Sequence, residues 1–517
     1  MTYASAAFSA PMHEAYDKAL SEAPAVLGQS HTLSINGEDL LSPTQFETYS
    51  PIDSSIRIGT FQNATTGQVH DACRHAARGF AAWRRVRWQD RVEVLRRTAE
   101  ILEKQALPLS ALITYEIGKV RAEAIAEVFE SVAMIRYYCN LYERNNGYSV
   151  RMEPGEPGQV AWSVLKPYGV FAVISPFNFP VSLATGMAAA VLLTGNTAVF
   201  KPTSEAPLAG RHLYQAFRDG GVPPAAFHFL TGPGKSFGEA ITSDPDVAGI
   251  AFTGSRDAGT WLQRAFVSRQ PYGKPVVLEL GSKNPVIVTR HADIGRAAAG
   301  IARSAFGYGG QKCSATSRVY VEKTVLPAFT DALLLEAKAL KTGDPRDRAT
   351  GLGPCINAAA AARFRACVAE AKAAGATVLC GGDVPTGGIF DRGHYVNPTV
   401  VAGLPRGHRL EQEELFLPFL IVAEYDTFED ALNRANATSF GLTAGIFSDD
   451  KDEVGRFFDA IESGVCYANR REGATTGAWP GSQPFCGWKA SGISGKGAGG
   501  PYYLLSFLRE QAQTRAG

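Results

Sequence analysis

The stretch from Tyr168 to Phe200, YGVFAVISPFNFPVSLATGMAAAVLLTGNTAVF, decides the fold class because it contains no charged side chain. Its length suits a membrane-spanning helix, but two prolines and Asn178 interrupt it early, and Gly195-Asn196 interrupts it late. We therefore predict a strand, a loop, a helix and a second strand. A β-α-β unit that is buried on both faces lacks charges for the same reason as a membrane helix. No association with a membrane is expected.

Short apolar strands alternate with helices on both sides of this unit. Such alternation is typical of parallel sheets that are covered by helices on both faces. The pattern predicts an α/β fold with two doubly wound parallel-sheet domains. One series of expected strands comprises Val170–Ser175, Thr197–Lys201, Phe227–Thr231, Val247–Phe252 and Val276–Leu280, and the second comprises Arg318–Glu322, Thr377–Leu379, Phe419–Tyr425 and Leu442–Phe447.

Two further segments show the period-two pattern of strands outside the layered core. Val160, Trp162 and Val164 recur at every second position after the turn-rich run Glu153-Pro-Gly-Glu-Pro-Gly158, and the tail from Tyr502 to Leu508 alternates in a similar way. We expect these segments to form a small discontinuous β arm. Unpaired strand edges are a liability that another subunit can cover, so the arm predicts oligomerisation.

The composition excludes several classes of protein. Apolar residues make up 45% and charged residues 20% of the 517 positions, which excludes a disordered chain. Lys plus Arg (51) and Asp plus Glu (50) leave a net charge of +1, whereas nucleic-acid binders concentrate positive charge. The eight cysteines contain no C-x-x-C pair, so we expect free thiols in a reducing cytoplasm and no metal site. No basic cluster leads into an apolar block near the N-terminus, so no secretory signal is expected.

Cys313 is the strongest candidate for a catalytic side chain. It ends the glycine-rich run Phe306-Gly-Tyr-Gly-Gly-Gln-Lys-Cys313, in which the glycines let the backbone approach a bound group closely. The neighbouring Lys312 is expected to favour the reactive thiolate. The alternative is a small buried hydrophobic residue, which is the commoner role of a free cysteine.

Glu279 and Asn178 are the next two candidates. Glu279 stands at the carboxyl end of an apolar strand, where an unpaired carboxylate is costly unless it has a function. The alternative is a salt bridge with Lys274 or Lys283. Asn178, between two aromatics and two prolines, can donate its amide to an oxygen that gains negative charge during a reaction. Alternatively, it caps the helix that is expected to begin near Val181.

Three further signals are weaker, and the first two point to a phosphate or ribose. The run Phe252-Thr-Gly-Ser-Arg-Asp-Ala-Gly259 follows a strand and opens a helix, and N–H groups at a helix start bind phosphate. Lys201 ends another strand and could reach a ribose or phosphate, although a solvated lysine is the simpler interpretation. The pair Glu413-Glu414 usually has no function on a surface turn.

Taken together, these segments resemble the aldehyde dehydrogenase superfamily from about residue 45 to the end of the chain. Each marker is weak alone, but their common order is specific. The markers are Pro-Phe-Asn-Phe-Pro180, Phe200-Lys-Pro202, Phe252-Thr-Gly-Ser255, Glu279-Leu-Gly281, Gly310-Gln-Lys-Cys313, Glu413-Glu-Leu-Phe416, Gln483-Pro-Phe485 and Ser491-Gly492.

The resemblance implies the chemistry and the cofactor. Cys313 would be the nucleophile that forms a thiohemiacetal and then a thioester, Glu279 the general base for hydrolysis, and Asn178 the oxyanion donor. The cofactor would be NAD or NADP, and the substrate a small aldehyde. The residues implied to contact the cofactor are Ser175, Pro176, Phe177, Lys201, Ser204, Gly234, Phe252, Gly254, Ser255, Leu280, Glu414 and Phe416.

Within the superfamily, the chain looks most like the branch that oxidises glutamate γ-semialdehyde, the open form of Δ1-pyrroline-5-carboxylate. The likeness rests on the loop before Cys313, on Asn469-Arg470 and on Gly499-Gly-Pro-Tyr502. The residues implied to contact this substrate are Phe179, Ser314, Phe485 and Gly487. Alternatives are an aromatic-aldehyde dehydrogenase, a CoA-acylating relative and a non-catalytic dinucleotide-binding scaffold.

The chain departs from the family pattern at four places. Cys486 stands where a glycine is usual and is expected to narrow or tilt the substrate pocket. Leu417 and Ser282 each replace a glycine. Ser204 stands where many NAD-dependent relatives carry a glutamate that binds the adenosine ribose, with Glu205 one position later. A carboxylate there repels a 2′-phosphate and a serine does not, so NADP is expected to be accepted unless Glu205 takes that place and restores the preference for NAD.

The resemblance also implies how the chain is divided. Residues 1–146 and 170–288 are expected to form the dinucleotide-binding domain, and residues 289–488 the catalytic domain. Residues 147–169 and 489–517 would form the oligomerisation arm of a homodimer or homotetramer.

Overall fold

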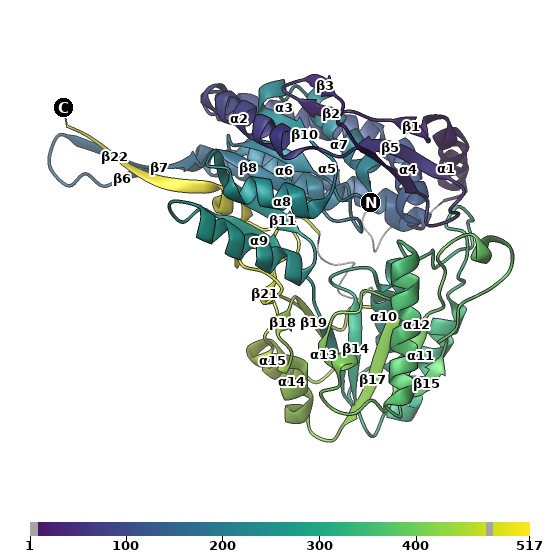
Figure 1. Cartoon of the computed structure of the whole chain (residues 1–517). Coiled ribbons are helices and arrows are strands. Elements are labelled where there is room, and N and C mark those ends of the chain that lie inside the picture. Colours follow the sequence, from purple (N-terminus) through teal and green to yellow (C-terminus); the bar gives the residue numbers. More distant parts are fainter. Residues whose placement is uncertain (1–8, 472–478, 517) are drawn as a thin grey trace.

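Two seven-stranded sheets form the cores of two α/β domains, which lie one above the other in Figure 1. The computed structural model describes residues 9–471 and 479–516. A three-stranded arm extends sideways from the upper domain (Figure 1). The expected fold class is therefore confirmed.

The first sheet has the strand order β12-β11-β8-β9-β10-β2-β3. Its strands from β12 to β10 are parallel, and β2 and β3 add an antiparallel edge. The chain runs outward from β8 in both directions, so the order reverses between β8 and β11, where α/β sheets bind ligands. The strands are β2 (Leu33–Ile35), β3 (Glu38–Leu40), β8 (Val170–Ile174), β9 (Thr197–Lys201), β10 (Phe227–Phe229), β11 (Val247–Thr253) and β12 (Val276–Glu279).

Helices cover both faces of this sheet. Phe171 and Val173 of β8 pack with α5, α6 and α7, whereas Val170 and Ala172 pack with α2, α8 and α9. Successive side chains of a strand point to opposite faces, so every position must be apolar, which explains the uncharged stretch. The helices are α1 (Ala10–Glu22), α2 (Thr66–Trp83), α3 (Trp88–Lys104), α4 (Ala106–Ile117), α5 (Arg121–Arg144), α6 (Ser182–Leu193), α7 (Pro207–Asp219), α8 (Gly234–Ser243) and α9 (Arg256–Arg269).

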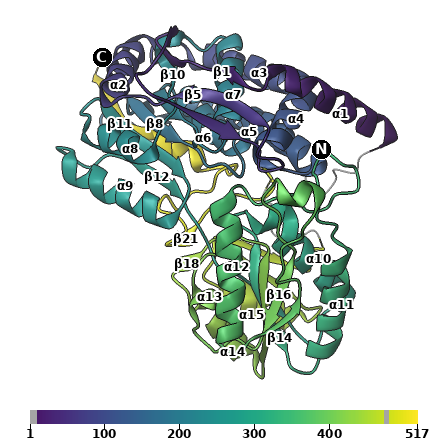
Figure 2. The same cartoon turned by 45° about the vertical axis from the view of Figure 1, so that its right-hand side comes forward.

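The second sheet has the strand order β15-β16-β17-β14-β13-β19-β20, and only β15 pairs antiparallel with its neighbour. Figure 2 shows it between α12 and α11. The sequence pattern does not single out β13, because Pro285 interrupts its apolar run. The strands are β13 (Asn284–Val288), β14 (Thr316–Glu322), β15 (Thr377–Cys380), β16 (Thr399–Ala402), β17 (Phe419–Tyr425), β19 (Thr443–Phe447) and β20 (Val465–Ala468).

The helices around the second sheet and two small sheets complete the fold. Among the described helices, none is long and apolar enough to cross a membrane. The remaining helices are α10 (Ile294–Phe306), α11 (Leu326–Ala339), α12 (Ala358–Ala373), α13 (Arg409–Gln412), α14 (Phe428–Asn436) and α15 (Lys451–Ala460), and the small sheets contain β1 (Gln29–Ser30), β4 (Gln45–Tyr49), β5 (Arg57–Gln62), β18 (Phe440–Gly441) and β21 (Trp488–Lys489).

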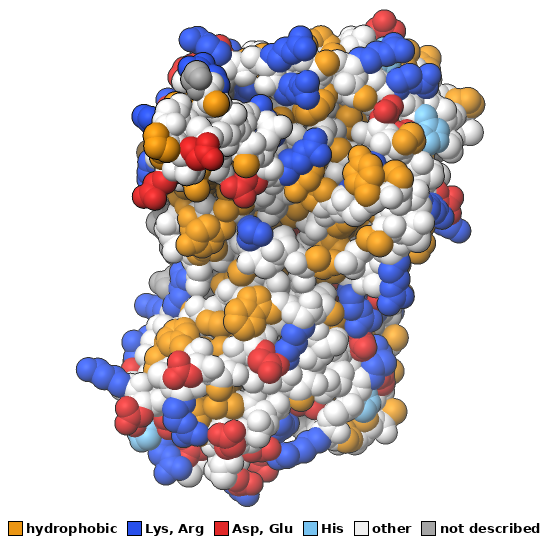
Figure 3. All heavy atoms as spheres, turned by 90° about the vertical axis from the view of Figure 1, so that its left-hand side faces the viewer, with side chains coloured by type: hydrophobic (Ala, Val, Ile, Leu, Met, Phe, Trp, Pro, Cys, Tyr) orange, Lys and Arg blue, Asp and Glu red, His pale blue; other side chains and the backbone are white. Residues whose placement is uncertain are grey.

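The arm is built from β6 (Ser149–Met152), β7 (Gln159–Pro167) and β22 (Leu508–Ala516), with β7 in the centre. The predicted strand at Tyr502–Leu508 is wrong: Tyr503–Phe507 forms a 3-10 helix, and the strand begins at Leu508. The apolar side chains of this segment pack into the core, where Phe507 contacts Phe171. The side of the molecule that carries the arm shows separate hydrophobic groups among charged side chains (Figure 3).

Candidate active site

The loop before Cys313 brings the thiol to the boundary between the two domains. After α10, a 3-10 turn (Gly307–Gly310) leads to Cys313 and then to β14. A Cβ on Gly310 would lie 2.2 Å from the carbonyl oxygen of Leu417, so only glycine fits there. The Asn284 amide donates to the carbonyl oxygens of Cys313 (2.7 Å) and Ala315 (2.8 Å). The backbone around the thiol is therefore fixed by both turn geometry and hydrogen bonds.

The Cys313 thiol is partly exposed, and the groups around it disfavour its thiolate form. Burial raises its pKa well above the ordinary value, and the carboxylates of Glu414 and Glu279 add to the effect. The prediction that Lys312 favours the thiolate is wrong. The Lys312 ammonium lies 2.5 Å from the Glu123 carboxylate, so its charge is paired with another group.

Asn178 lies on the loop between β8 and α6, and its amide donates to the carbonyl oxygen of Gln311 at 3.0 Å. It does not cap α6, whose N-cap residue, Val181, makes no side-chain capping bond. Instead, the carboxylate of Glu127 accepts from the N–H groups of Val181 (2.8 Å) and Ser182 (3.3 Å). The Asn178 amide is thus directed toward the loop that carries Cys313.

Glu279 ends β12 as a buried carboxylate that pairs with no cationic side chain among the described residues. Neither lysine proposed for a salt bridge pairs with it: Lys274 donates to the carbonyl oxygens of Pro245 and Val247, and Lys283 has no hydrogen-bond partner within the described chain. Burial raises the pKa of Glu279 well above its ordinary value, although the backbone of Gly487 donates to the carboxyl group. Burial therefore favours the neutral form of the Glu279 carboxyl group.

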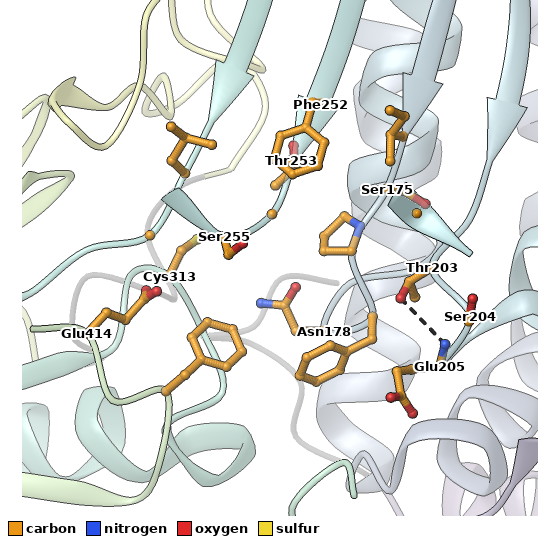
Figure 4. Close-up of a pocket in the computed structure, with 18 of the residues that line it drawn as sticks. Ser175, Asn178, Thr203, Ser204, Glu205, Phe252, Thr253, Ser255, Cys313 and Glu414 are labelled. Carbon is orange, nitrogen blue, oxygen red and sulfur yellow. Dashed lines mark hydrogen bonds between the residues drawn. The ribbon is translucent and has the colours of Figure 1, made fainter. Parts of the chain in front are cut away.

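A cavity of about 580 Å³ opens at the carboxyl ends of β8, β9 and β11, at the point where the strand order reverses. Figure 4 shows Cys313 and Glu414 on one side of it, Thr203, Ser204 and Glu205 on the other, and Asn178 between them. Every residue implied to contact the cofactor lines this cavity. The volume lies in the range of small-molecule and cofactor sites.

Polar groups in this cavity are held by the backbone. Glu414 accepts from the N–H of Ser282 at 2.8 Å, and burial raises its pKa to about 7. Lys201 donates to the carbonyl oxygen of Pro202 at 2.8 Å, and burial lowers its pKa to about 8. A Cβ on Gly281 would lie 2.2 Å from the Glu414 carboxylate, so a larger residue there would displace that carboxylate.

Several residues that line this cavity were given no role in the sequence analysis. Thr203 and Arg363 line it, and Arg363 donates to the carbonyl oxygen of Leu415 at 3.2 Å. Arg363 belongs to α12 of the other domain, so nothing in its local sequence marks it. Thr203 stands two residues beyond Lys201, and that spacing was the available signal.

A second cavity, of about 60 Å³, meets the first at Cys313. Of the residues implied to contact the substrate, Phe179, Ser314 and Phe485 line this cavity and Gly487 does not. The Gly487 backbone faces Glu279 instead. Helix α5 adds residues to this cavity that the sequence analysis missed, because they lie in a plain helical pattern. They are Glu130 and Met134.

The departures from the family pattern leave both cavities open. The Cys486 thiol faces the carbonyl oxygen of Gly464 at 3.5 Å, and Cys486 is absent from the wall of the smaller cavity. The Ser282 hydroxyl accepts from the N–H of Leu442 at 3.3 Å, on the side away from Glu414. Leu417 is buried. In residues 9–471 and 479–516, no cluster of three or more His, Cys, Asp or Glu could hold a metal ion.

Comparisons with known proteins agree with this geometry. A family model described as "Aldehyde dehydrogenase family" matches residues 40–512. The 1-pyrroline-5-carboxylate dehydrogenase 1 of Halalkalibacterium halodurans is 33% identical over 97% of this chain and 95% of its own length. The 1-pyrroline-5-carboxylate dehydrogenase of Bacillus subtilis (strain 168) is 32% identical over the same shares.

Solved structures show the same similarity. A 1-pyrroline-5-carboxylate dehydrogenase from Thermus with bound NAD has a TM-score of 0.93 at 31% identity, and the match covers 98% of this chain and 97% of that one. Betaine aldehyde dehydrogenase from Staphylococcus aureus in complex with NAD+ has a TM-score of 0.90 at 26% identity, over 96% and 97% of the two chains.

Proposed function

We propose that this chain, which belongs to the aldehyde dehydrogenase family, oxidises glutamate γ-semialdehyde to glutamate with NAD. The observation that carries the proposal is that Cys313 is shared by the two cavities. A thiol at that junction can hold an aldehyde carbon in the smaller cavity beside a dinucleotide in the larger one. Aldehyde oxidation is the activity that the family and its 1-pyrroline-5-carboxylate dehydrogenase relatives support.

The Cys313 thiolate attacks the aldehyde carbon, and the carbonyl oxygen becomes an alkoxide. Asn178 and the N–H of Cys313 donate to that oxygen, which stabilises the developing charge. A dinucleotide held in the larger cavity by Lys201, Ser255 and Glu414 would supply the hydride acceptor, and loss of a hydride from the same carbon leaves a thioester on Cys313. Water then attacks the thioester, and the thiol leaves as the acid is released.

Glu279 serves as the base that removes a proton from this water. In the present arrangement its carboxyl group faces Gly487 and lies outside the walls of both cavities. We propose that it rotates toward Cys313 once the thioester has formed. A carboxyl group with a raised pKa is a stronger base when it is deprotonated, which suits this role.

The groups in the larger cavity fit a dinucleotide. Ser255 caps α9, and the exposed N–H groups at that helix start suit a phosphate. Nothing lies within 4 Å of a Cβ built on Gly234, so the start of α8 is open to a ligand. Glu414 and Lys201 supply polar contacts for ribose or phosphate, and Gly281 keeps the backbone close to Glu414.

NAD is preferred over NADP because of Glu205. This carboxylate lines the cavity, and its Oε1 accepts from the Asn357 amide at 3.0 Å. Ser204, by contrast, donates its hydroxyl to the carbonyl oxygen of Gly232 at 3.1 Å. Of these two residues, Glu205 therefore supplies the charge at the end of the cavity that would hold the adenosine ribose, and this charge repels a 2′-phosphate.

The smaller cavity favours an amino-acid aldehyde. Phe179 and Phe485 provide apolar walls for the carbon chain, and Ser314 is placed to hold the α-carboxylate. Glu130 adds a carboxylate to the same wall, which suits an α-ammonium group. A neutral aliphatic or benzylic aldehyde would leave Glu130 without a charged counterpart in the substrate.

The arm supports assembly into a homodimer or homotetramer. Its exposed side chains include Val150, Met152 and Trp162, and β6 forms one edge of its sheet. Pairing with another subunit would cover both the edge and the apolar side chains.

A substrate panel tests the function. Glutamate γ-semialdehyde, propanal and benzaldehyde are compared with NAD+ and with NADP+ by the absorbance of the reduced cofactor. We expect the highest kcat/KM with glutamate γ-semialdehyde and NAD+. A higher kcat/KM for either neutral aldehyde would overturn the substrate assignment, and formation of an acyl-CoA in preference to the free acid would overturn hydrolysis.

A further inference from the structure

Helix α5 carries two carboxylates one turn apart, and each binds a different part of the proposed catalytic machinery. Glu123 pairs with Lys312, the residue immediately before Cys313, at 2.5 Å. Glu127 accepts from the backbone N–H groups of Val181 and Ser182, just beyond Asn178 and Phe179. Residues at i and i+4 lie on the same face of a helix, so one face of α5 reaches both segments.

Lys119 completes the cluster around Glu127. Its Nζ lies 2.5 Å from Glu127 Oε2, and both side chains are fully buried. The same ammonium lies 3.6 Å from the centre of the Phe179 ring and 5.1 Å from that of Tyr308, in the glycine-rich loop. An ammonium group over an aromatic face is attracted to it. Lys119 therefore contacts both Phe179, in the wall of the smaller cavity, and Tyr308, in the loop before Cys313.

A buried ion pair of this kind needs an explanation other than stability. Desolvation of two charges offsets most of their attraction, and apolar replacements are often neutral or stabilising. Burial lowers the pKa of Lys119, which reflects this cost. Glu127 accepts directional hydrogen bonds at the start of α6, and Lys119 contacts two aromatic rings. These interactions favour a role of the pair in fixing the positions of the segments that it contacts.

We propose that Glu127, paired with Lys119, is a positioning residue for the oxyanion donor, and that Glu123 positions the nucleophile loop in the same way. The inference rests on the proposed function. By holding the first N–H groups of α6, Glu127 sets the direction of the preceding loop and hence the place of the Asn178 amide. By holding Lys312, Glu123 sets the place of the thiol.

The test compares Glu127→Gln with the wild-type enzyme in two reactions. Hydrolysis of 4-nitrophenyl acetate needs the thiol and the oxyanion donor but no dinucleotide. Oxidation of glutamate γ-semialdehyde needs the thiol, the oxyanion donor and the dinucleotide. We expect kcat to fall about 10- to 100-fold in both, since a misplacement of 1 Å can cost about 100-fold. The Kd for NAD+, measured by fluorescence titration, is expected to stay within twofold. Glu123→Gln is expected to slow alkylation of Cys313 by iodoacetamide.

Glu116 provides a matched control. Its buried carboxylate, on α4, accepts from the N–H groups of Leu208 (2.6 Å) and Ala209 (2.8 Å) at the start of α7. Glu116→Gln thus perturbs a helix start of the same chemistry that does not precede Asn178. We expect it to leave ester hydrolysis within twofold of the wild type, whatever its effect on the melting temperature.

A double variant covers the case in which Glu127→Gln does not fold. Lys119→Met with Glu127→Leu removes both charges and leaves no unpaired ion, and we expect it to fold and to lose ester hydrolysis at least tenfold. The proposal is overturned if either Glu127 variant folds and keeps both rates within twofold, or if Glu116→Gln lowers them equally. A wild type that hydrolyses the ester but oxidises no aldehyde would reject the proposed function and leave the ester comparison decisive.

Discussion

Replacement of Glu205 by glutamine tests how the cavity distinguishes NAD from NADP. The carboxylate stands at the ribose end of the cavity, fixed there by the Asn357 amide at 3.0 Å. Glutamine keeps the size and the hydrogen-bonding capacity of the side chain but removes its charge. A 2′-phosphate placed beside residue 205 would then meet no like charge.

The magnitude follows from Coulomb's law. Two unit charges 4 Å apart repel each other by about 1 kcal/mol in water and by about 4 kcal/mol at an effective dielectric constant of about 20. Glu205 is exposed, so we take a value near the lower limit, about 1.5–2 kcal/mol. At 1.4 kcal/mol per tenfold, kcat/KM for NADP+ should rise about 10- to 30-fold. The kcat/KM for NAD+ should fall about 3- to 10-fold, because a charged acceptor for the ribose hydroxyls is lost.

The assay measures initial rates with a fixed aldehyde and varied NAD+ or NADP+. Asn357→Ser is the matched variant, because serine can still cap α12 but cannot donate to Glu205 from the same position. We expect it to weaken the NAD preference less than Glu205→Gln does. The reasoning is refuted if kcat/KM for NADP+ does not change in Glu205→Gln, since the carboxylate would then have no influence on the 2′ position.

Further predictions concern the proposed nucleophile, the base, a buried carboxyl group and the arm. Cys313→Ser should lower aldehyde oxidation at least 1000-fold while NAD+ still binds, as measured by fluorescence titration; retained activity would remove Cys313 from the mechanism. Glu279→Gln should leave a burst of reduced cofactor, followed by turnover that is at least about 100-fold slower than in the wild type. In the wild type, thioester hydrolysis should accelerate with rising pH, because Glu279 must lose its proton. A steady-state rate that does not change from pH 6 to 9 would contradict this. Burial raises the pKa of Glu116 to about 8, above its value in the unfolded chain. The folded state therefore retains a proton that the unfolded state releases, and the free energy of unfolding falls as pH rises from about 4.5 to 8. Glu116→Gln should reduce this fall in thermal unfolding, and a pH profile identical to that of the wild type would refute the assignment. Ending the chain after Phe507 removes β22 and should lower the oligomeric mass in analytical ultracentrifugation, whereas an unchanged mass would exclude the arm from the interface.

Local patterns predicted the layered architecture well, because they depend on burial alone. Strands Thr197–Lys201 and Phe419–Tyr425 lie where the apolar runs indicate. A strand that is buried on both faces and a membrane helix both lack charges, so the prolines, Asn178 and Gly195-Asn196 within residues 168–200 are what distinguish the β-α-β unit. The motifs around Cys313 and Asn178 could be found in the same way, because glycine and proline constrain the backbone locally.

The tertiary structure alone decided which side chains share a site. Arg363 and Glu205 line the larger cavity from different domains. Glu130 lines the smaller cavity from α5, whose sequence shows only an ordinary helical pattern. The buried pair of Lys119 and Glu127 carries no local signal either. The pairing of Lys312 with Glu123 also reversed an expectation based on sequence neighbours.

The physical reason is that burial of one face of an element produces a periodic pattern of apolar residues in the sequence. The identity of the residue that a side chain contacts produces no such pattern. Periodicity arises because each strand or helix must bury one or both faces, so it is written into every element separately. A contact between α5 and the loop of Cys313 exists only after segments that are far apart in the chain have packed together. The sequence therefore determined the layers and the candidate thiol and amide, and the packing of the two domains determined the cavities, the direction of Glu279 and the charges around them.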